Sequence, residues 1–110
     1  MDLNLKQLYD LIFSPIVTPY NLLDNLQLPN YKYINYSKTQ SGVIATIGCS
    51  IEKDFFANFN YYFDNNNYLQ KVIMKSDEGE EIVFDRLIET ERIKERVTDN
   101  LSDSISEPAV

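Results

Sequence analysis

The stretch that decides the fold is ANFNYYFDNNNYL, residues 57–69. Its first half continues an alternation that begins at Phe55, with only apolar side chains on one face and Asn, Phe56 and Tyr62 on the other. Because side chains alternate between the two faces of a strand, this pattern predicts a strand with one buried face. The asparagine-rich segment 64–67 tolerates the left-handed backbone of a tight reversal. Residues 57–69 therefore predict the arms and tip of a β-hairpin.

Strand signals continue on both sides of this hairpin. The further segments that are rich in β-forming residues or alternate with period two are residues 31–36, 43–51, 68–75 and 81–85. Short polar segments separate neighbouring strands, and connections of that length join antiparallel neighbours. The sequence therefore predicts a single antiparallel β-meander of about four or five strands.

Helical periodicity marks the N-terminal part of the chain. An apolar stripe over residues 3–13 predicts a helix, which Pro15 ends because proline disfavours the helical conformation in the residue before it. Thr18 followed by Pro19 predicts the start of a short second helix that reaches about Leu28.

The period becomes helical again after the last strand. Ile93, Val97 and Leu101 form a narrow stripe and predict a helix over residues 86–101. Residues 102–110 have little to pack and predict an acidic C-terminal tail behind a single domain of residues 1–101. The fold class is therefore α+β, an antiparallel meander with N-terminal helices and a C-terminal helix packed on or beside the sheet.

The predicted core is taken from the apolar positions of these elements. Its members are Leu5, Leu8, Ile12, Leu23, Val43, Ala45, Ile47, Phe55, Phe59, Phe63, Val72, Met74, Val83 and Ile93. Burial of each contributes ~1.5–3 kcal/mol, which is enough to support one domain.

The net charge of −7 is unevenly distributed. Residues 1–75 carry six acidic and six basic side chains, whereas residues 76–110 carry eleven acidic and four basic ones. An acidic end repels nucleic acid and anionic membranes, and it attracts a partner with a basic surface. A solvated helix with a solubilising tail is the alternative explanation for the same charges.

Several catalytic chemistries lack their usual residues. The chain has no histidine, so the commonest general base and many transition-metal sites are excluded. Cys49 lies among alternating apolar positions, where a free cysteine behaves as a small buried hydrophobe. The three glycines do not form a phosphate-binding loop. We therefore expect no enzymatic activity, no catalytic residue, no metal and no cofactor.

Two surfaces are candidates for binding a protein partner. The acidic end supplies Glu89, Glu91, Glu95, Asp99 and Asp103. The sheet supplies Tyr31, Tyr33, Asn58, Asn60 and Tyr62, and tyrosine with asparagine is typical of adaptable recognition surfaces. The leading hypothesis is a non-enzymatic protein-binding module in the style of a small acidic inhibitor or immunity protein that occludes its partner.

Two other classes of function stay open. The sheet tyrosines with nearby lysines are the best argument for a binder of a small ligand or of single-stranded nucleic acid, although the net charge disfavours nucleic acid. A structural subunit of a larger assembly would associate with itself through the C-terminal helix. Residues 1–13 lack the pattern of a signal peptide and no apolar run is long enough to span a bilayer, so the sequence predicts a cytoplasmic protein without membrane contact.

Overall fold

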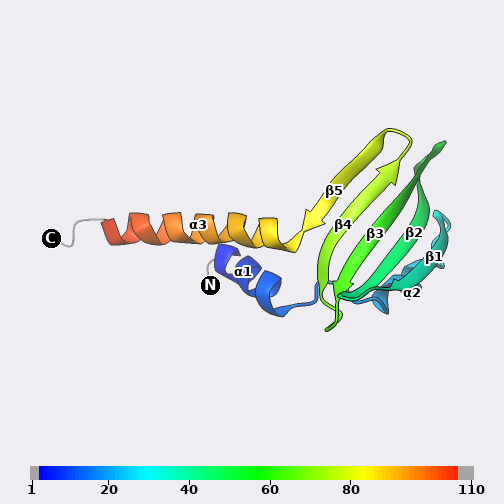
Figure 1. Ribbon diagram of the computed structural model, residues 1–110. Helices are drawn as coiled ribbons and strands as arrows, with labels where there is room; N and C mark the ends of the chain where they lie inside the picture. The colour runs from blue at the N-terminus through cyan, green and yellow to red at the C-terminus, as the bar shows by residue number, and fades with distance from the viewer. Residues whose placement is uncertain (1–2, 107–110) are drawn as a thin grey trace.

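The chain forms an α+β fold in which a five-stranded antiparallel sheet carries a helical arm (Figure 1). This computed structural model describes the backbone of residues 3–106 and the side chains of residues 5–99. The elements in chain order are α1 (Leu3–Phe13), α2 (Asn21–Asn25), β1 (Tyr31–Lys38), β2 (Gly42–Glu52), β3 (Phe55–Asp64), β4 (Leu69–Ser76), β5 (Gly79–Asp85) and α3 (Arg86–Ser106). The strands pair in the order β1-β2-β3-β4-β5, which confirms the predicted meander.

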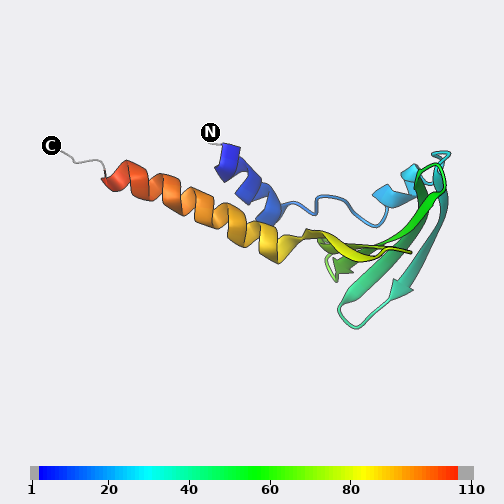
Figure 2. The same cartoon turned by 90° about the horizontal axis from the view of Figure 1, so that it is seen from above.

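The core lies on one face of the curved sheet, which we call the inner face. Ala45, Ile47, Phe63 and Val72 are buried there, and Leu22 of α2 packs onto them. The segment that joins α1 to β1 crosses this face and places α2 on its concave side (Figure 2). The opposite face, which we call the outer face, carries the side chains that alternate with the core positions.

The predicted core is right for the middle of the sheet and wrong at its margins. Ala45, Ile47, Phe63, Val72 and Ile93 are buried as expected. Five more predicted core residues are half-buried, namely Leu8, Val43, Phe55, Phe59 and Met74. The remaining four are exposed, namely Leu5, Ile12, Leu23 and Val83.

Local geometry explains two of these corrections. Leu22 is 2% exposed and Leu23 is 50% exposed, because the short helix α2 turns Leu22 toward the sheet. Where β4 pairs with β5, Val72 lies opposite Phe84 and Ile73 lies opposite Ile82. Val83 is therefore an extra residue of β5 in a β-bulge. The bulge places Phe84 against the core and turns Val83 to solvent.

The helical arm consists of α1 and α3, which pack side by side and extend away from the sheet (Figures 1 and 2). α3 lies beside the sheet and not across a face of it. The radius of gyration is 18.0 Å, whereas a compact domain of this length has ~13 Å. The arm therefore leaves helix surface exposed that a compact domain would bury, including Leu5 and Ile12.

Two helix boundaries differ from the prediction. α2 ends at Asn25 and not near Leu28, and residues 26–30 form turns that lead into β1. α3 continues through Ser106, because its sequence contains no proline or glycine before Pro108. Residues 102–106, which the sequence analysis assigns to a tail, are therefore helical, and residues 107–110 lie outside the described part of the chain.

Candidate functional site

The arm is anchored to the sheet by Arg86, the first residue of α3. Its guanidinium is buried and donates to the carbonyl oxygen of Leu69 at 2.6 Å, to that of Pro15 at 3.2 Å, and to that of Leu11. The Leu11 carbonyl lacks its usual helical donor, because the residue four positions later is a proline without an N–H group. Arg86 therefore supplies from a distant part of the chain the hydrogen bond that the end of α1 cannot make for itself.

Tyr68 completes this anchor. Its hydroxyl donates to the carbonyl oxygen of Phe13 at 3.0 Å, and its ring centroid lies 5.5 Å from the guanidinium carbon of Arg86. Burial lowers the pKa of Arg86 below its ordinary value, and the nearby Asp64 and Tyr68 act in the opposite direction. A cation at the C-terminal end of α1 also interacts favourably with the helix dipole. The anchor fixes where the arm leaves the sheet.

At the lower end of the sheet in Figure 1, α2 and the turns next to it form a second structured region. The side chains of Thr18 and Asn21 cap the start of this segment reciprocally: Asn21 Oδ1 accepts from Thr18 N at 2.8 Å, and Thr18 Oγ1 accepts from Asn21 N at 3.3 Å. Tyr36 of β1 donates its hydroxyl to the carbonyl oxygen of Pro19 at 2.7 Å. Leu22 is buried against the sheet, and these hydrogen bonds keep the side chains of Tyr20 and Leu23 exposed to solvent.

The asparagine-rich tip lies at the same end of the sheet and has a defined conformation. Asp64 Oδ1 accepts from the backbone N–H groups of Asn66 and Tyr68, both at 2.9 Å. Asn67 adopts a φ of 65°, which confirms the left-handed turn expected from the sequence. The tip therefore presents Asn65 and Asn67 from an ordered turn.

Two adjoining hollows open between α2, the β1–β2 turn and this tip. One has a volume of about 280 Å³ and is lined by Pro19, Tyr20, Leu23, Tyr36, Val43 and Asn67. The other has a volume of about 350 Å³ and is lined by Tyr36, Ser37, Lys38, Gly42, Val43, Asp64, Asn65 and Asn67. They share Tyr36, Val43 and Asn67, so they form one surface, which we call the α2-end surface. It combines exposed Tyr and Leu side chains with amide groups, a composition typical of protein-recognition surfaces.

Four of the five predicted sheet residues lie on the outer face. Tyr33 packs across Gly48 and donates its hydroxyl to Asn58 Oδ1, and Thr46 Oγ1 donates to Asn60 Oδ1 at 2.8 Å. The amide oxygens of both asparagines are thus occupied within the sheet. Tyr62 lies on the same face, across from Lys71.

Tyr31, the fifth predicted residue, belongs to the inner face. Tyr31 pairs with Cys49 and Tyr33 with Gly48, so Lys32 is an extra residue in a β-bulge. The bulge turns Tyr31 toward the core, where it lines a hollow of about 260 Å³ with Cys49 and Tyr61. That volume is below the usual range for small-molecule sites.

The lysines of the outer face do not form a basic groove. Lys71 Nζ lies 3.8 Å from Asp85 Oδ2, and Lys75 Nζ lies 3.6 Å from Glu80 Oε1. Each of these two lysines of β4 therefore has a carboxylate neighbour, which reduces the positive charge that they could offer to a phosphate backbone.

The negative charge of the C-terminal third is unevenly distributed between β5 and α3. α3 carries five acidic and four basic side chains, and Glu89 and Glu91 lie within 4 Å of Arg92 and Lys94. Glu95 and Asp99 are exposed, and the side chain of Asp103 lies outside the described part. The strongest excess of negative charge is in residues 77–85, the β4–β5 turn and β5, which have five acidic and no basic residues.

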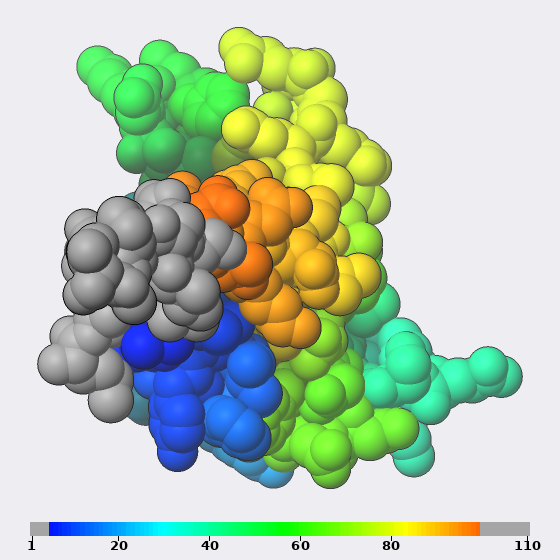
Figure 3. All heavy atoms as spheres, turned by 90° about the vertical axis from the view of Figure 1, so that its left-hand side faces the viewer, coloured from blue at the N-terminus to red at the C-terminus, as the bar shows by residue number. Residues whose placement is uncertain are grey.

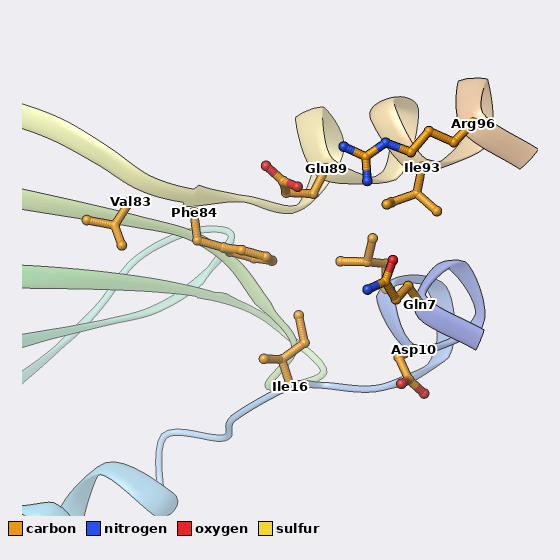
Figure 4. Close-up of a pocket in the computed structure, with 9 residues that line it drawn as sticks. Gln7, Asp10, Ile16, Val83, Phe84, Glu89, Ile93 and Arg96 are labelled. Atoms are coloured by element: carbon orange, nitrogen blue, oxygen red, sulfur yellow. The ribbon is translucent and has the colours of Figure 1, made fainter. Parts of the chain in front are cut away.

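A further hollow of about 550 Å³ lies in the arm, between α1, the end of β5 and α3 (Figure 4). The apolar side chains of Ile16, Phe84 and Ile93 line it from different elements. Its charged lining residues are Asp10, Glu89 and Arg96, so the hollow contains both signs of charge.

Burial shifts the pKa values of two side chains on the inner face, Cys49 and Tyr61. Burial raises the pKa of the Cys49 thiol, which disfavours the nucleophilic thiolate. Burial, with smaller contributions from Tyr31 and Cys49, also raises the pKa of Tyr61. Among the residues described, no three His, Cys, Asp or Glu side chains gather in a way that could hold a metal ion. No helix in this part of the chain is both long enough and apolar enough to cross a membrane.

Comparison with known proteins gives no relative: no protein-family model matches the chain, no curated protein has a significantly similar sequence, and no solved structure matches its fold.

Sequence reasoning placed the sheet surface on β1 and β3 and missed the α2-end surface. The contributing residues come from segments around positions 20, 40 and 66, which only the fold brings together. The local signal in the sequence is the asparagine-rich tip, whose composition predicts a turn.

Proposed function

We propose that the protein is a non-enzymatic binding module that docks on a partner protein through the α2-end surface. The observation that carries this proposal is the pair of adjoining hollows beside the exposed side chains of Tyr20 and Leu23. Exposed apolar patches with a polar rim are characteristic of protein-binding sites. Here Tyr36 and Val43 also line the hollows, together with the polar side chains of Asn65, Asn67 and Lys38.

The local structure favours binding with little rearrangement. The Thr18–Asn21 cap, the Tyr36–Pro19 hydrogen bond and the turn around Asp64 hold the surface in one conformation before a partner arrives. A surface that is ordered in advance loses less conformational entropy on binding. The acidic β4–β5 hairpin contributes to association by attracting a partner with a basic region.

The proposal places the protein in the cytoplasm, where a free thiol such as that of Cys49 stays reduced. If docking covers the active surface of the partner, the protein acts as an inhibitor or an immunity-type protein. Assaying the partner's activity with and without the protein separates inhibition from simple binding.

Affinity capture from a lysate of the source cells tests the proposal. The wild-type protein should retain one partner protein in near-equal amount, and Leu23→Asp should reduce that amount at least about tenfold by placing a charge in the interface. Ile82→Asp is the matched control, because Ile82 is 55% exposed and lies on β5, outside the α2-end surface. The control variant should retain the partner fully.

Two outcomes would contradict this assignment. Equal retention by wild type and Leu23→Asp would exclude the α2-end surface. Loss of the partner in a Tyr62→Ala variant, with Leu23→Asp unaffected, would assign binding to the outer face instead.

A further inference from the structure

We propose that the protein forms a homodimer in which α1 packs antiparallel against α1 of a second copy. This interface is separate from the α2-end surface and goes beyond the proposed function. It uses an apolar stripe on α1, defined by Leu5, Tyr9, Ile12 and Phe13, that no other described element covers.

The stripe follows from helical spacing. Among the described side chains of α1, Leu8 and Leu11 are the half-buried leucines, and Leu11 lines the hollow between α1 and α3 with Ile93. The four stripe residues are spaced i, i+4, i+7 and i+8 and therefore share another side of the helix. Figure 3 looks at the arm from its end and shows α1 beside α3.

The exposure of the stripe is unusual for so many large apolar residues. Tyr9 and Phe13 are 61% and 59% exposed, and Leu5 and Ile12 are 43% and 42% exposed. The rings of Tyr9 and Phe13 lie against each other, with centroids 4.8 Å apart, so the aromatic part of the stripe is one continuous surface. A helix with apolar residues on two sides packs in two directions, and α3 fills only one of them.

The available area fits an interface between two copies. Tyr9 and Phe13 are aromatic side chains of the kind that bury ~150–250 Å² each, and Leu5 and Ile12 are smaller, so the exposed part of the four-residue stripe offers roughly 400 Å² per copy. Two copies then bury at most ~800 Å², the size of a weak, transient contact. The dimer is therefore expected to be reversible and to depend on concentration.

Charge complementarity sets the orientation. The described side chains of α1 include one basic residue, Lys6, and one acidic residue, Asp10, which lie one helical turn apart on the same flank of the stripe. Neither takes part in an ion pair with another described side chain. A two-fold axis near Tyr9 makes the same flank of both helices face each other, so Lys6 of each copy approaches Asp10 of the other. In this arrangement Lys6 of one copy and Asp10 of the other are ~3 Å apart along the direction of the helix axes, and a lysine side chain can reach over that distance.

Sedimentation equilibrium of the full-length protein tests the dimer directly. The mass should rise from one chain to two between about 1 and about 500 µM, the range expected for so small an interface. Tyr9→Glu should weaken dimerisation at least about tenfold, since it places two like charges near the axis. Leu87→Glu is the control: Leu87 is 71% exposed but lies on α3, outside the stripe, and its dimer should be unchanged.

A charge-reversal pair distinguishes α1–α1 packing from association elsewhere. Lys6→Glu should weaken the dimer by about threefold to tenfold, and Lys6→Glu with Asp10→Lys should restore it, because the reversed charges pair again across the axis. A protein that remains monomeric over the whole concentration range would overturn the proposal. A dimer that persists in Tyr9→Glu, or that the double reversal does not restore, would overturn it as well.

Discussion

Replacing Arg86 with alanine is expected to lower the free energy of unfolding by about 3–5 kcal/mol, the usual cost of losing a buried, charged hydrogen-bonding group. Its three acceptors are backbone carbonyls from α1, the following loop and the start of β4. In the variant the carbonyl of Leu11 has no helical donor to return to, since Pro15 cannot supply one. The loss should appear as a lower midpoint in urea unfolding followed by circular dichroism.

Arg86→Ala should destabilise some elements of the chain more than others. Amide hydrogen exchange in α1 should become much faster, whereas β2 and β3 in the centre of the sheet should keep their protection. Arg86→Lys should recover less than half of the lost stability, because an ammonium group cannot reproduce the planar set of N–H donors of the guanidinium group. Arg92→Ala removes an exposed arginine that pairs with Glu89 and should cost no more than ~0.5 kcal/mol. Equal losses for Arg86→Ala and Arg92→Ala would contradict the anchoring role of Arg86.

The second large effect is expected at Leu22. Leu22→Ala should cost about 2–4 kcal/mol, because it removes a fully buried side chain and leaves a cavity against Ala45, Ile47 and Phe63. The adjacent Leu23→Ala should cost less than ~1 kcal/mol, since half of that side chain is already in water. Thermal unfolding of the two variants beside the wild type measures both values. A larger loss at Leu23 than at Leu22 would mean that α2 faces the sheet with its other side.

The sheet could be predicted from sequence because its signal is local. Alternation between Phe55 and Phe63, and turn residues at both ends of β3, determine the hairpin without help from the rest of the chain. The helices at both ends have equally local signals. The bulges at Lys32 and Val83 could not be predicted, because one extra residue in a strand leaves the composition unchanged while it turns Tyr31 to the inner face and leaves Val83 exposed.

The candidate site was harder to predict because it depends on distant contacts. Arg86 looks like an ordinary first residue of a helix until the carbonyls of Leu11 and Pro15, more than 70 positions earlier, are placed beside it. The choice of Leu22 over Leu23 depends on how a five-residue helix sits on the sheet, and such a helix is too short to show an apolar stripe. The acidic end is visible in the sequence, and the structure adds that two of its carboxylates, Glu80 and Asp85, lie beside Lys75 and Lys71 of β4.

The most direct test of the binding function is photo-crosslinking in living source cells with a benzophenone amino acid in place of single tyrosines. At position 20, in the α2-end surface, the protein should form an adduct with one partner protein. At position 62, on the outer face, the same probe should form none. An adduct at position 62 and none at position 20 would contradict the proposed α2-end surface.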